Sequence, residues 1–494
     1  MLLRMKSLAR HLLLALTLTG QLLHPAPGHA TTLTRHPSLW KVTTSSIQIA
    51  WQTDVAAPGK VLYGLTPALG SEATDAVTAT DHAVTLNGLA QMSRYYYRIV
   101  AGPDTLTAGD DTLHTAPPGA APFRFVAFGD CGTGDANQYA VAARVGALNP
   151  DLALILGDVI YEGGEAANFT PRYFTPYRPI IRRSVWYPVV GNHDIVTSNG
   201  QPFLDAFYLP TNSVDGTEKY YSFDYGNAHF AAIDGNQPFN TNMYGWLDAD
   251  LAQTTKPWKF VYFHQPMYSD PGVHGSDLTL RSYLEPILVG HDVDVVFQGH
   301  NHYYSRSYPI RNGVAVDTAQ GSSYHNPGGV IYIVAGGGGR GLYGVTNTDP
   351  LIRSAFSVFH TASVDVVGDS INVQAVLPDG TVFDSFSIVK SGVTAVEVAN
   401  AALLPSMKRP KPNPFDRQAE FSFTLPRPSP VRLTIRDVQG RRVREVIGRD
   451  LPAGPHSATW DGRDDRGRRA ATGIYFAILE AGGTVVRTRV ALLR

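Results

Sequence analysis

The sequence predicts a multidomain protein in which a layered α/β domain lies between two all-β domains. With 494 residues, ordinary domain sizes give about three domains. Between residues 121 and 390, short apolar runs alternate with segments of helical spacing, such as 138–147 and 278–288. On either side of this region, short strand-like segments are separated by turn residues, which is typical of β-sandwiches.

The N-terminus has the features of an export signal. Three basic residues precede an apolar run from Leu12 to Leu23, and a small-residue cleavage site ends at Ala30. The run is short and interrupted by polar residues, so a retained membrane anchor is only the alternative interpretation. We therefore expect residues 1–30 to be a signal peptide and the mature chain, without a transmembrane segment, to be secreted, periplasmic or at the cell surface of a bacterium.

Strand and turn patterns divide the rest of the chain. Residues 31–118 predict an all-β domain with strands at 46–52, 59–63, 82–86 and 95–100. Residues 121–390 form the α/β domain, and residues 391–413, which end in prolines among basic residues, predict a linker. Residues 414–494 predict a second all-β domain with strands at 419–425, 431–436, 443–446, 457–460, 473–480 and 485–493.

Five apolar runs of the α/β domain are each followed by a short polar motif. The runs are 123–128, 152–156, 186–190, 260–263 and 293–297, and the polar side chains that follow them are Asp130, Asp158, Tyr161, Asn192, His264, His300 and His302. Loops at the carboxyl ends of strands in α/β proteins gather polar groups at one edge. Carboxylate, phenolate, amide and imidazole donors suit Fe, Mn or Zn, whereas the single cysteine excludes iron–sulfur clusters and cysteine zinc sites.

This series of motifs, including the tyrosine, resembles the purple acid phosphatases of the calcineurin-like metallophosphoesterase superfamily. The resemblance implies two mixed sheets packed face to face with helices outside, and strands at 330–335, 363–367 and 371–377 that complete the second sheet. It also implies two metal sites that share Asp158. The first site has Asp130, Asp158, Tyr161 and His302 as ligands, and the second has Asp158, Asn192, His264 and His300.

The donor chemistry agrees with unequal metals. A phenolate with two carboxylates favours Fe(III) in the first site, while the second site suits a divalent Fe, Zn or Mn ion. Two such ions hold and activate a hydroxide that attacks phosphorus, so no serine or cysteine nucleophile is required. The predicted function is a secreted acid phosphatase that hydrolyses small phosphate monoesters.

Two histidines are candidates for catalysis and substrate binding beside Asn192. His193 adjoins Asn192, and His274 follows His264 by ten residues, the distance at which the resemblance implies a phosphate-binding proton donor. Plant-type members often have two adjacent histidines there, whereas this chain has Val273 before His274. A phosphodiesterase or nucleotide pyrophosphatase is one alternative function, and a surface binding protein with a vestigial catalytic domain is another.

The flanking domains also have resemblances. The N-terminal domain resembles the fibronectin type III-like domain of larger purple acid phosphatases. The C-terminal domain resembles the immunoglobulin-like module of the flagellar hook-capping protein and bacterial C-terminal sorting domains, which implies contact with the cell surface or secretion machinery. Calcium binding by Asp461, Asp464 and Asp465 is a weaker hypothesis, because their spacing departs from the EF-hand loop.

Other features of the sequence point away from further functions. The net charge of −1 gives no basic excess of the kind that nucleic-acid binders show. The glycine run 336–339 lacks the Gly-Lys-Ser/Thr of a phosphate loop, so we interpret it as a turn near the metal site. Cys131 is expected to be a buried small side chain.

Overall fold

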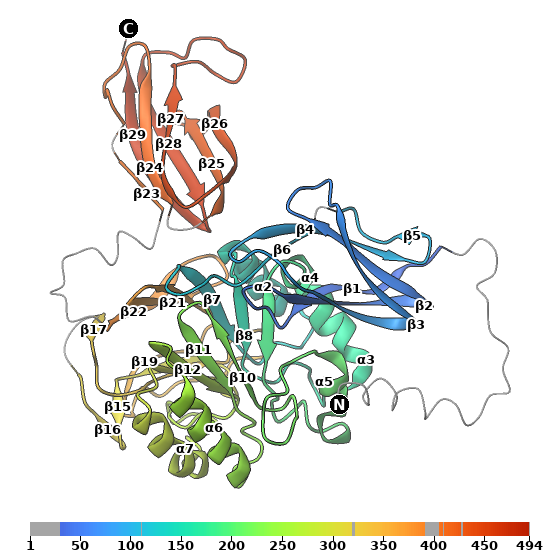
Figure 1. Ribbon diagram of the computed structural model, residues 1–494. Coiled ribbons are helices and arrows are strands. Elements are labelled where there is room, and N and C mark those ends of the chain that lie inside the picture. Colours follow the sequence, from blue (N-terminus) through green and yellow to red (C-terminus); the bar gives the residue numbers. More distant parts are fainter. Residues whose placement is uncertain are drawn as a thin grey trace.

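The computed structural model describes residues 30–109, 111–318, 322–390, 405–408, 410–425 and 428–493. The predicted signal peptide, apart from its last residue, and most of the predicted linker lie outside these residues. Figure 1 shows a central α/β domain, an N-terminal all-β domain beside it and a C-terminal all-β domain above them. This is the predicted fold class.

The N-terminal domain is built on one long strand. Its strands are β1 (Leu33–Trp40), β2 (Ile47–Gly64), β3 (Ser71–Leu86), β4 (Arg94–Ala101), β5 (Asp104–Thr105) and β6 (Asp111–His114). β2 joins the two strands that the sequence predicts at 46–52 and 59–63, because the chain continues through a bulge instead of turning. It pairs with β1, β3 and β4.

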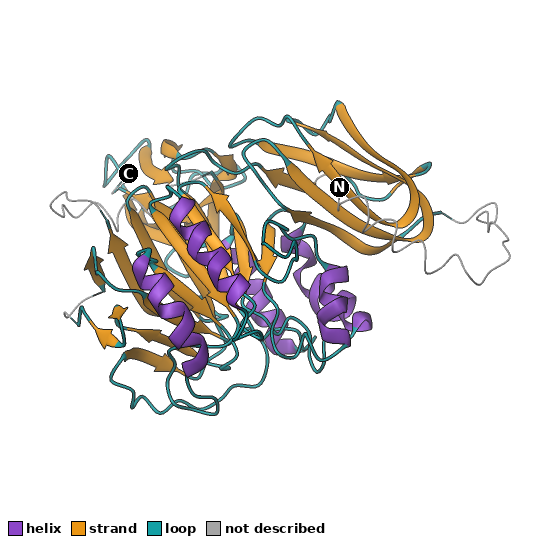
Figure 2. Cartoon of the chain, turned by 60° about the horizontal axis from the view of Figure 1, so that its bottom comes forward, coloured by secondary structure: helices purple, strands orange, loops and turns teal. Residues whose placement is uncertain are grey.

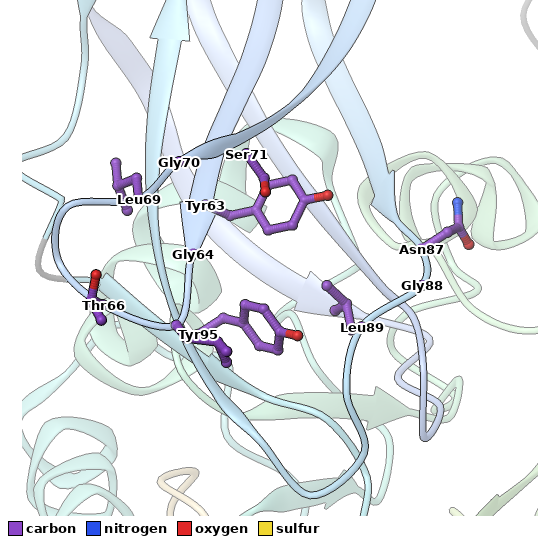
Figure 3. Close-up of a pocket in the computed structure, with 11 residues that line it drawn as sticks. Tyr63, Gly64, Thr66, Leu69, Gly70, Ser71, Asn87, Gly88, Leu89 and Tyr95 are labelled. Atoms are coloured by element: carbon purple, nitrogen blue, oxygen red, sulfur yellow. The ribbon is translucent and has the colours of Figure 1, made fainter.

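A cavity of about 440 Å³ lies at one end of this domain (Figure 3). The rings of Tyr63 and Tyr95 face it, with their centroids 6.3 Å apart. All of its lining residues belong to the N-terminal domain, between Tyr63 and Tyr95. The cavity therefore contains none of the predicted metal donors.

The first sheet of the central domain contains three adjacent parallel strands. Its strands are β7 (Phe123–Phe128), β8 (Leu152–Ile155), β9 (Val185–Pro188), β17 (Ser323–His325), β20 (Thr361–Val367), β21 (Ser370–Val376) and β22 (Val382–Val389), in the order β17-β22-β21-β20-β7-β8-β9. β7, β8 and β9 are parallel, whereas β20 is antiparallel to β7. β1 pairs with β9, so the sheet continues into the N-terminal domain.

The second sheet lies face to face with the first. Its strands are β10 (Tyr221–Tyr225), β11 (Ala228–Ala232), β12 (Trp258–Phe263), β13 (Val295–Gln298), β14 (Tyr304–Ser307), β18 (Ile331–Ala335) and β19 (Ile352–Phe356), in the order β10-β11-β12-β13-β18-β14-β19. A small hairpin of β15 (Ile310–Arg311) and β16 (Val314–Ala315) lies beside it.

Aromatic side chains fill the space between the two sheets. Phe125 of β7 makes edge-to-face contacts with three phenylalanines of the second sheet, at centroid distances of 5.3 Å to Phe230, 5.1 Å to Phe260 and 5.7 Å to Phe297. Such pairs add to the free energy of burying the rings themselves. The core therefore fixes the spacing of the sheets whose ends carry the polar motifs.

Helices cover the outer faces of both sheets. They are α2 (Ala136–Leu148), α3 (Ala166–Phe169), the π-helix η1 (Thr170–Phe174), α4 (Thr175–Ile181), the 3₁₀-helix η2 (Ser198–Gly200), α5 (Gln201–Ala206), α6 (Thr241–Gln253) and α7 (Leu278–Gly290). α6 and α7 lie side by side on the second sheet, as Figure 2 shows, and α2 and α4 pack near the first. Among the described residues, no helix is long and apolar enough to span a membrane.

The structure corrects one part of the predicted topology. The strand at 330–335 belongs to the second sheet, but the strands at 363–367 and 371–377, now β20 and β21, belong to the first. Their apolar runs identify them as strands without specifying a partner. The free edge of β7 receives them because the parallel strand β8 occupies its other edge.

The C-terminal domain is a sandwich of two antiparallel sheets. Its strands are β23 (Ser406–Met407), β24 (Ala419–Leu425), β25 (Ser429–Arg436), β26 (Arg442–Leu451), β27 (Gly454–Trp460), β28 (Gly473–Ala481) and β29 (Thr484–Leu492), arranged as β23-β24-β27 and β26-β25-β28-β29. β23 falls within the predicted linker but pairs with β24, so the domain begins before residue 414.

The three aspartates considered for calcium make other contacts. Asp464 accepts hydrogen bonds from two backbone N–H groups and pairs with Arg468, at 2.9 Å. Asp461 and Asp465 face other arginines. Among the described residues, these three aspartates do not form a group whose ligand atoms could meet at one ion, which argues against the calcium hypothesis.

A buried ion pair ties the core of the central domain together. Arg124 of β7 binds both carboxylate oxygens of Asp365 of β20, at 2.6 and 2.8 Å, and both side chains are nearly inaccessible. Arg124 also donates to the backbone oxygens of Leu148 and of Gly482 in the C-terminal domain.

We expect Asp365→Ala to lower the free energy of unfolding by roughly 3 kcal/mol, because the Arg124 charge stays buried without its partner. Thermal unfolding followed by circular dichroism measures the effect. Glu72→Ala, which breaks the exposed pair with Lys60, is the control and should change stability by less than about 1 kcal/mol. Equal melting temperatures for both variants would contradict the prediction.

Candidate metal centre

The seven predicted donors meet at one edge of the two sheets. Each follows the carboxyl end of a strand: Asp130 follows β7, Asp158 and Tyr161 follow β8, Asn192 follows β9, His264 follows β12, and His300 and His302 follow β13. Backbone hydrogen bonds join these loops, for instance from Asp130 N to Gly157 O at 3.1 Å and from Gly299 N to His264 O at 2.9 Å. The structure therefore brings together side chains that are up to 172 residues apart in the chain.

The first cluster surrounds the hydroxyl of Tyr161. This oxygen lies 3.1 Å from Asp130 Oδ1, 2.9 Å from Asp158 Oδ2 and 3.1 Å from His302 Nε2. His302 Nδ1 donates to the backbone oxygen of Gly341 at 2.8 Å, which leaves Nε2 as the nitrogen that faces the cluster. These are the four side chains expected for the first site.

The second cluster surrounds the amide oxygen of Asn192. This oxygen lies 3.0 Å from His264 Nε2 and 2.9 Å from His300 Nδ1. Asp158 Oδ1 is 3.4 Å from His264 Nε2, so the two oxygens of Asp158 face different clusters. His264 Nδ1 donates to Leu156 O at 2.7 Å, which again directs Nε2 inward.

The chemistry of these donors fits metal ions. Asp130, Asp158 and His264 can present ligand atoms within 4.8 Å of one another, and all three are buried. Burial lowers the pKa of His264, but the carboxylates of Asp158 and Asp130 outweigh it and raise that pKa to about 9. Burial and the same two carboxylates hold the pKa of Tyr161 well above its usual value. The cluster therefore concentrates negative charge that a bound cation would neutralise, and a cation would also favour the phenolate form of Tyr161.

The backbone turns sharply at three of the ligands. Asp130, Asp158 and His300 have φ angles of +60°, +48° and +67°, in the left-handed region that side chains seldom adopt. Such strain persists only where surrounding structure enforces it, and it is common at functional sites. Here it lets a side chain turn back over the end of its strand.

Glycines in the motifs allow the loops to approach closely. A Cβ atom at Gly157 would lie 2.5 Å from His264 Nδ1, and one at Gly191 would lie 2.1 Å from Asp158 Oδ1. The glycine run has the same role, because Gly338 N donates to Gly129 O at 3.0 Å and a Cβ at Gly336 would lie 2.2 Å from Asn301 O. The run is a close-packed turn beside the metal centre, as interpreted from the sequence.

His193 and His274 both contact the ligands and are partly exposed. His193 Nε2 is 3.9 Å from Asp158 Oδ2, and its Nδ1 is 2.6 Å from Glu162 O. The ring of His274 lies 4.4 Å from that of His300. Burial and the positive field of His302 lower the pKa of His274. Cys131 is fully buried, and burial raises its pKa, so it behaves as the expected inert side chain.

Asp194 is a positioning residue whose role the sequence analysis did not predict. Its buried carboxylate accepts hydrogen bonds from the backbone of Val159 at 3.1 Å, Ile160 at 3.0 Å and Gly191 at 2.8 Å. It thereby joins the loop of Asp158 and Tyr161 to that of Asn192. Its place in the Gly-Asn-His-Asp motif was the only available signal, because nothing in the sequence reveals that its carboxylate binds backbone N–H groups.

Three further residues that sequence patterns do not single out lie beside the first cluster. Arg340 and Tyr343 come from the loop after the glycine run, and Glu162 follows Tyr161. The ring of Tyr343 stacks on His302 at 4.1 Å, and the guanidinium of Arg340 lies 4.8 Å from the centre of the Tyr161 ring.

The fold and the site define the class of the protein. Residues 123–304 match the sequence profile of the calcineurin-like phosphoesterase family, and residues 411–488 match that of the FlgD Ig-like domain. The central domain is therefore a calcineurin-like phosphoesterase domain, with a buried Asp/Asp/His cluster suited to metal.

Within that class, the chain is similar to purple acid phosphatases. It is 28% identical over 275 residues to purple acid phosphatase 22 of Arabidopsis thaliana, across 52% of this chain and 58% of that one. It is 29% identical to purple acid phosphatase 21 of the same plant over equal shares. The chain thus spans less than two thirds of these relatives. The purple acid phosphatase from yellow lupin (Lupinus luteus) seeds has the same fold, with a TM-score of 0.64 and 18% identity over 75% of this chain and 78% of that one.

We expect Asp194→Ala to reduce metal content to less than half of the wild-type value, because three backbone N–H groups lose their acceptor and the two ligand loops separate. Elemental analysis of the purified protein measures the effect. Asp369→Ala, at an exposed turn, should leave the metal content unchanged. Full metal occupancy in Asp194→Ala would show that the loops hold their positions without this carboxylate.

Proposed function

We propose that the protein is an exported acid phosphatase that hydrolyses small phosphate monoesters at a dinuclear metal centre. The observation that carries the proposal is the complete set of seven donors in two clusters that share Asp158. A vestigial domain in a surface binding protein would have no need to retain this set. The relatives described above support a phosphoesterase, and monoester preference is our inference from them.

The donor set favours Fe(III) with Asp130, Asp158, Tyr161 and His302, and a divalent Fe, Zn or Mn ion in the other cluster. When bound, such a metal pair supplies an activated water nucleophile and stabilises the charge that develops on the phosphoryl group. Asp158 sets the separation of the two clusters through its two oxygens. The hydrogen bonds from His264 Nδ1 and His302 Nδ1 to backbone oxygens set the tautomers of both rings.

The partly exposed histidines are placed to bind the phosphate and to donate a proton. His274 lies against His300 and is placed to contact the phosphate and to donate a proton to the leaving group. His193 is held by Glu162 O and lies beside Tyr161, with a ring separation of 4.6 Å, so it is placed to bind a phosphoryl oxygen with Asn192. Metal ions and a protonated imidazole side chain together favour an acidic pH optimum for hydrolysis.

We expect Tyr161→Phe to lose a visible absorption band, because phenolate-to-iron charge transfer requires the Tyr161 oxygen. His264→Ala should lose phosphate release from an aryl phosphate by a factor of about 10³ or more, because a ligand of the second cluster is gone. Absorption spectra, metal analysis and phosphate assays on the same samples measure these effects. His325→Ala, at an exposed position, is the control.

A colourless, metal-free yet fully active wild-type protein would rule the proposal out. Parallel kinetics on aryl phosphate monoesters and diesters decide between the monoesterase and the alternative phosphodiesterase or nucleotide pyrophosphatase. A higher kcat/KM for the diester would favour that alternative.

We further propose that the C-terminal domain contacts the cell surface or the secretion machinery. Its similarity to the FlgD Ig-like domain and its separate sandwich support a role apart from catalysis. We expect removal of residues 405–494 to leave phosphatase activity in the domain that remains but to change its distribution between cells and medium. Fractionated activity assays measure this, and an unchanged distribution would contradict the proposal.

A further inference from the structure

An exposed ion pair lies beside the candidate metal centre. Arg340 Nη1 lies 2.7 Å from Glu162 Oε1, and its Nη2 lies 2.9 Å from Oε2. The guanidinium therefore binds the carboxylate through two parallel contacts. Its side chain is 37% exposed and that of Glu162 is 63% exposed, so solvent and ligands can reach both groups.

Both partners are attached to ligands of the first cluster. The guanidinium lies over the ring of Tyr161, and Arg340 N donates to Asp130 O at 2.9 Å. Glu162 follows Tyr161 in the chain, and its backbone oxygen contacts His193. The pair is thus held close to the centre by the backbone, while its charged ends remain free to exchange partners.

Tyr343 lies on the same side of the first cluster as Arg340. Its ring stacks on His302, and its backbone N donates to His302 O at 3.0 Å. The 340–343 loop therefore lines the first cluster.

The position of the guanidinium determines what it can bind. The oxygen of Tyr161, not its ring, faces the other donors, so a group over the ring lies beside the cluster and not within it. A phosphoryl group held by metals would therefore not be the nearest partner for Arg340. A second anionic group on the same substrate would lie nearer to the guanidinium.

Glu162 is a displaceable occupant of this position. Exposed ion pairs contribute little to stability, so the pair can be broken at small cost. The planar guanidinium presents its donors in a fork that matches a carboxylate or a phosphate equally well. A substrate anion can thus replace the Glu162 carboxylate on Arg340, and the released carboxylate is exposed enough for water to solvate it.

We propose that Arg340, released from Glu162, binds a second anionic group of the substrate and makes phosphate monoesters with a carboxylate or a further phosphate group the preferred substrate class. This inference rests on the proposed phosphatase function. Arg340 determines specificity because it attracts the second anionic group. Glu162 competes for Arg340, so an anion without a phosphoryl group, which the metals would not hold, does not displace it.

Equilibrium binding of a non-hydrolysable ligand pair tests the inference without turnover. The probes are phosphonopropionate, which has a carboxylate, and its carboxamide, which lacks that charge. Calorimetry on the metal-loaded protein should give about tenfold tighter binding of the carboxylate. Arg340→Gln should remove this preference, because the cation is gone.

Glu162→Gln should change the preference in the opposite direction, increasing it severalfold, because the competing carboxylate is gone. Arg311→Gln is the matched control, since Arg311 is a surface arginine paired with an aspartate at 3.8 Å and lies on the β15–β16 hairpin. It should leave the preference at the wild-type value. Metal content is measured on every sample, so a loss of the metal centre in Arg340→Gln is detected. In that case the binding preference of Glu162→Gln tests the inference.

Three results would overturn the inference. They are equal binding of both probes by the wild-type protein, an intact preference in Arg340→Gln, and an unchanged or reduced preference in Glu162→Gln. Phosphate release from phenyl phosphate is assayed separately. Its absence would reject the phosphatase function, while the binding ratios still report on Arg340.

Discussion

The site depends on Asp158, whose two carboxylate oxygens face two different clusters. For this to happen, the residue after β8 must turn back over the strand end, and its φ of +48° is the local cost of that turn. Gly157 and Gly191 leave room for the turn, and Asp194 holds the neighbouring loops by accepting three backbone hydrogen bonds. Phe125 packs against three phenylalanines of the opposite sheet, and this contact fixes the spacing of the two sheets whose ends carry Asp158 and His264.

The residues around this shared carboxylate fall into a buried inner group and a partly exposed outer group. Five of the seven predicted ligands are buried, and hydrogen bonds to backbone oxygens fix the second ring nitrogens of His264 and His302. His193, His274, Arg340 and Tyr343 are partly exposed and contact the ligands from outside. In the function proposed above, the buried residues would hold the metals, whereas the exposed residues would meet the substrate and select among phosphate esters.

Much of the fold and the inner site could be predicted from the sequence. Apolar runs such as 123–128 are buried on both faces, so their composition alone marks them as strands, and donor residues directly after them are expected at one sheet edge. Strand partners were harder. β20 and β21 were predicted in the wrong sheet, and β23 was predicted as linker, because pairing depends on which edge is free and not on the composition of the strand.

The sequence by itself determined the donor set, its order and hence the class of chemistry, because donor type and position after a strand are local properties. It also determined the three-domain organisation through changes in strand and helix pattern. Only the tertiary structure decided that Asp194 supports the loops and that Arg340 meets Glu162 over Tyr161. The contact between Arg340 and Glu162 joins residues 178 positions apart, and no local sequence pattern records a contact that only folding creates.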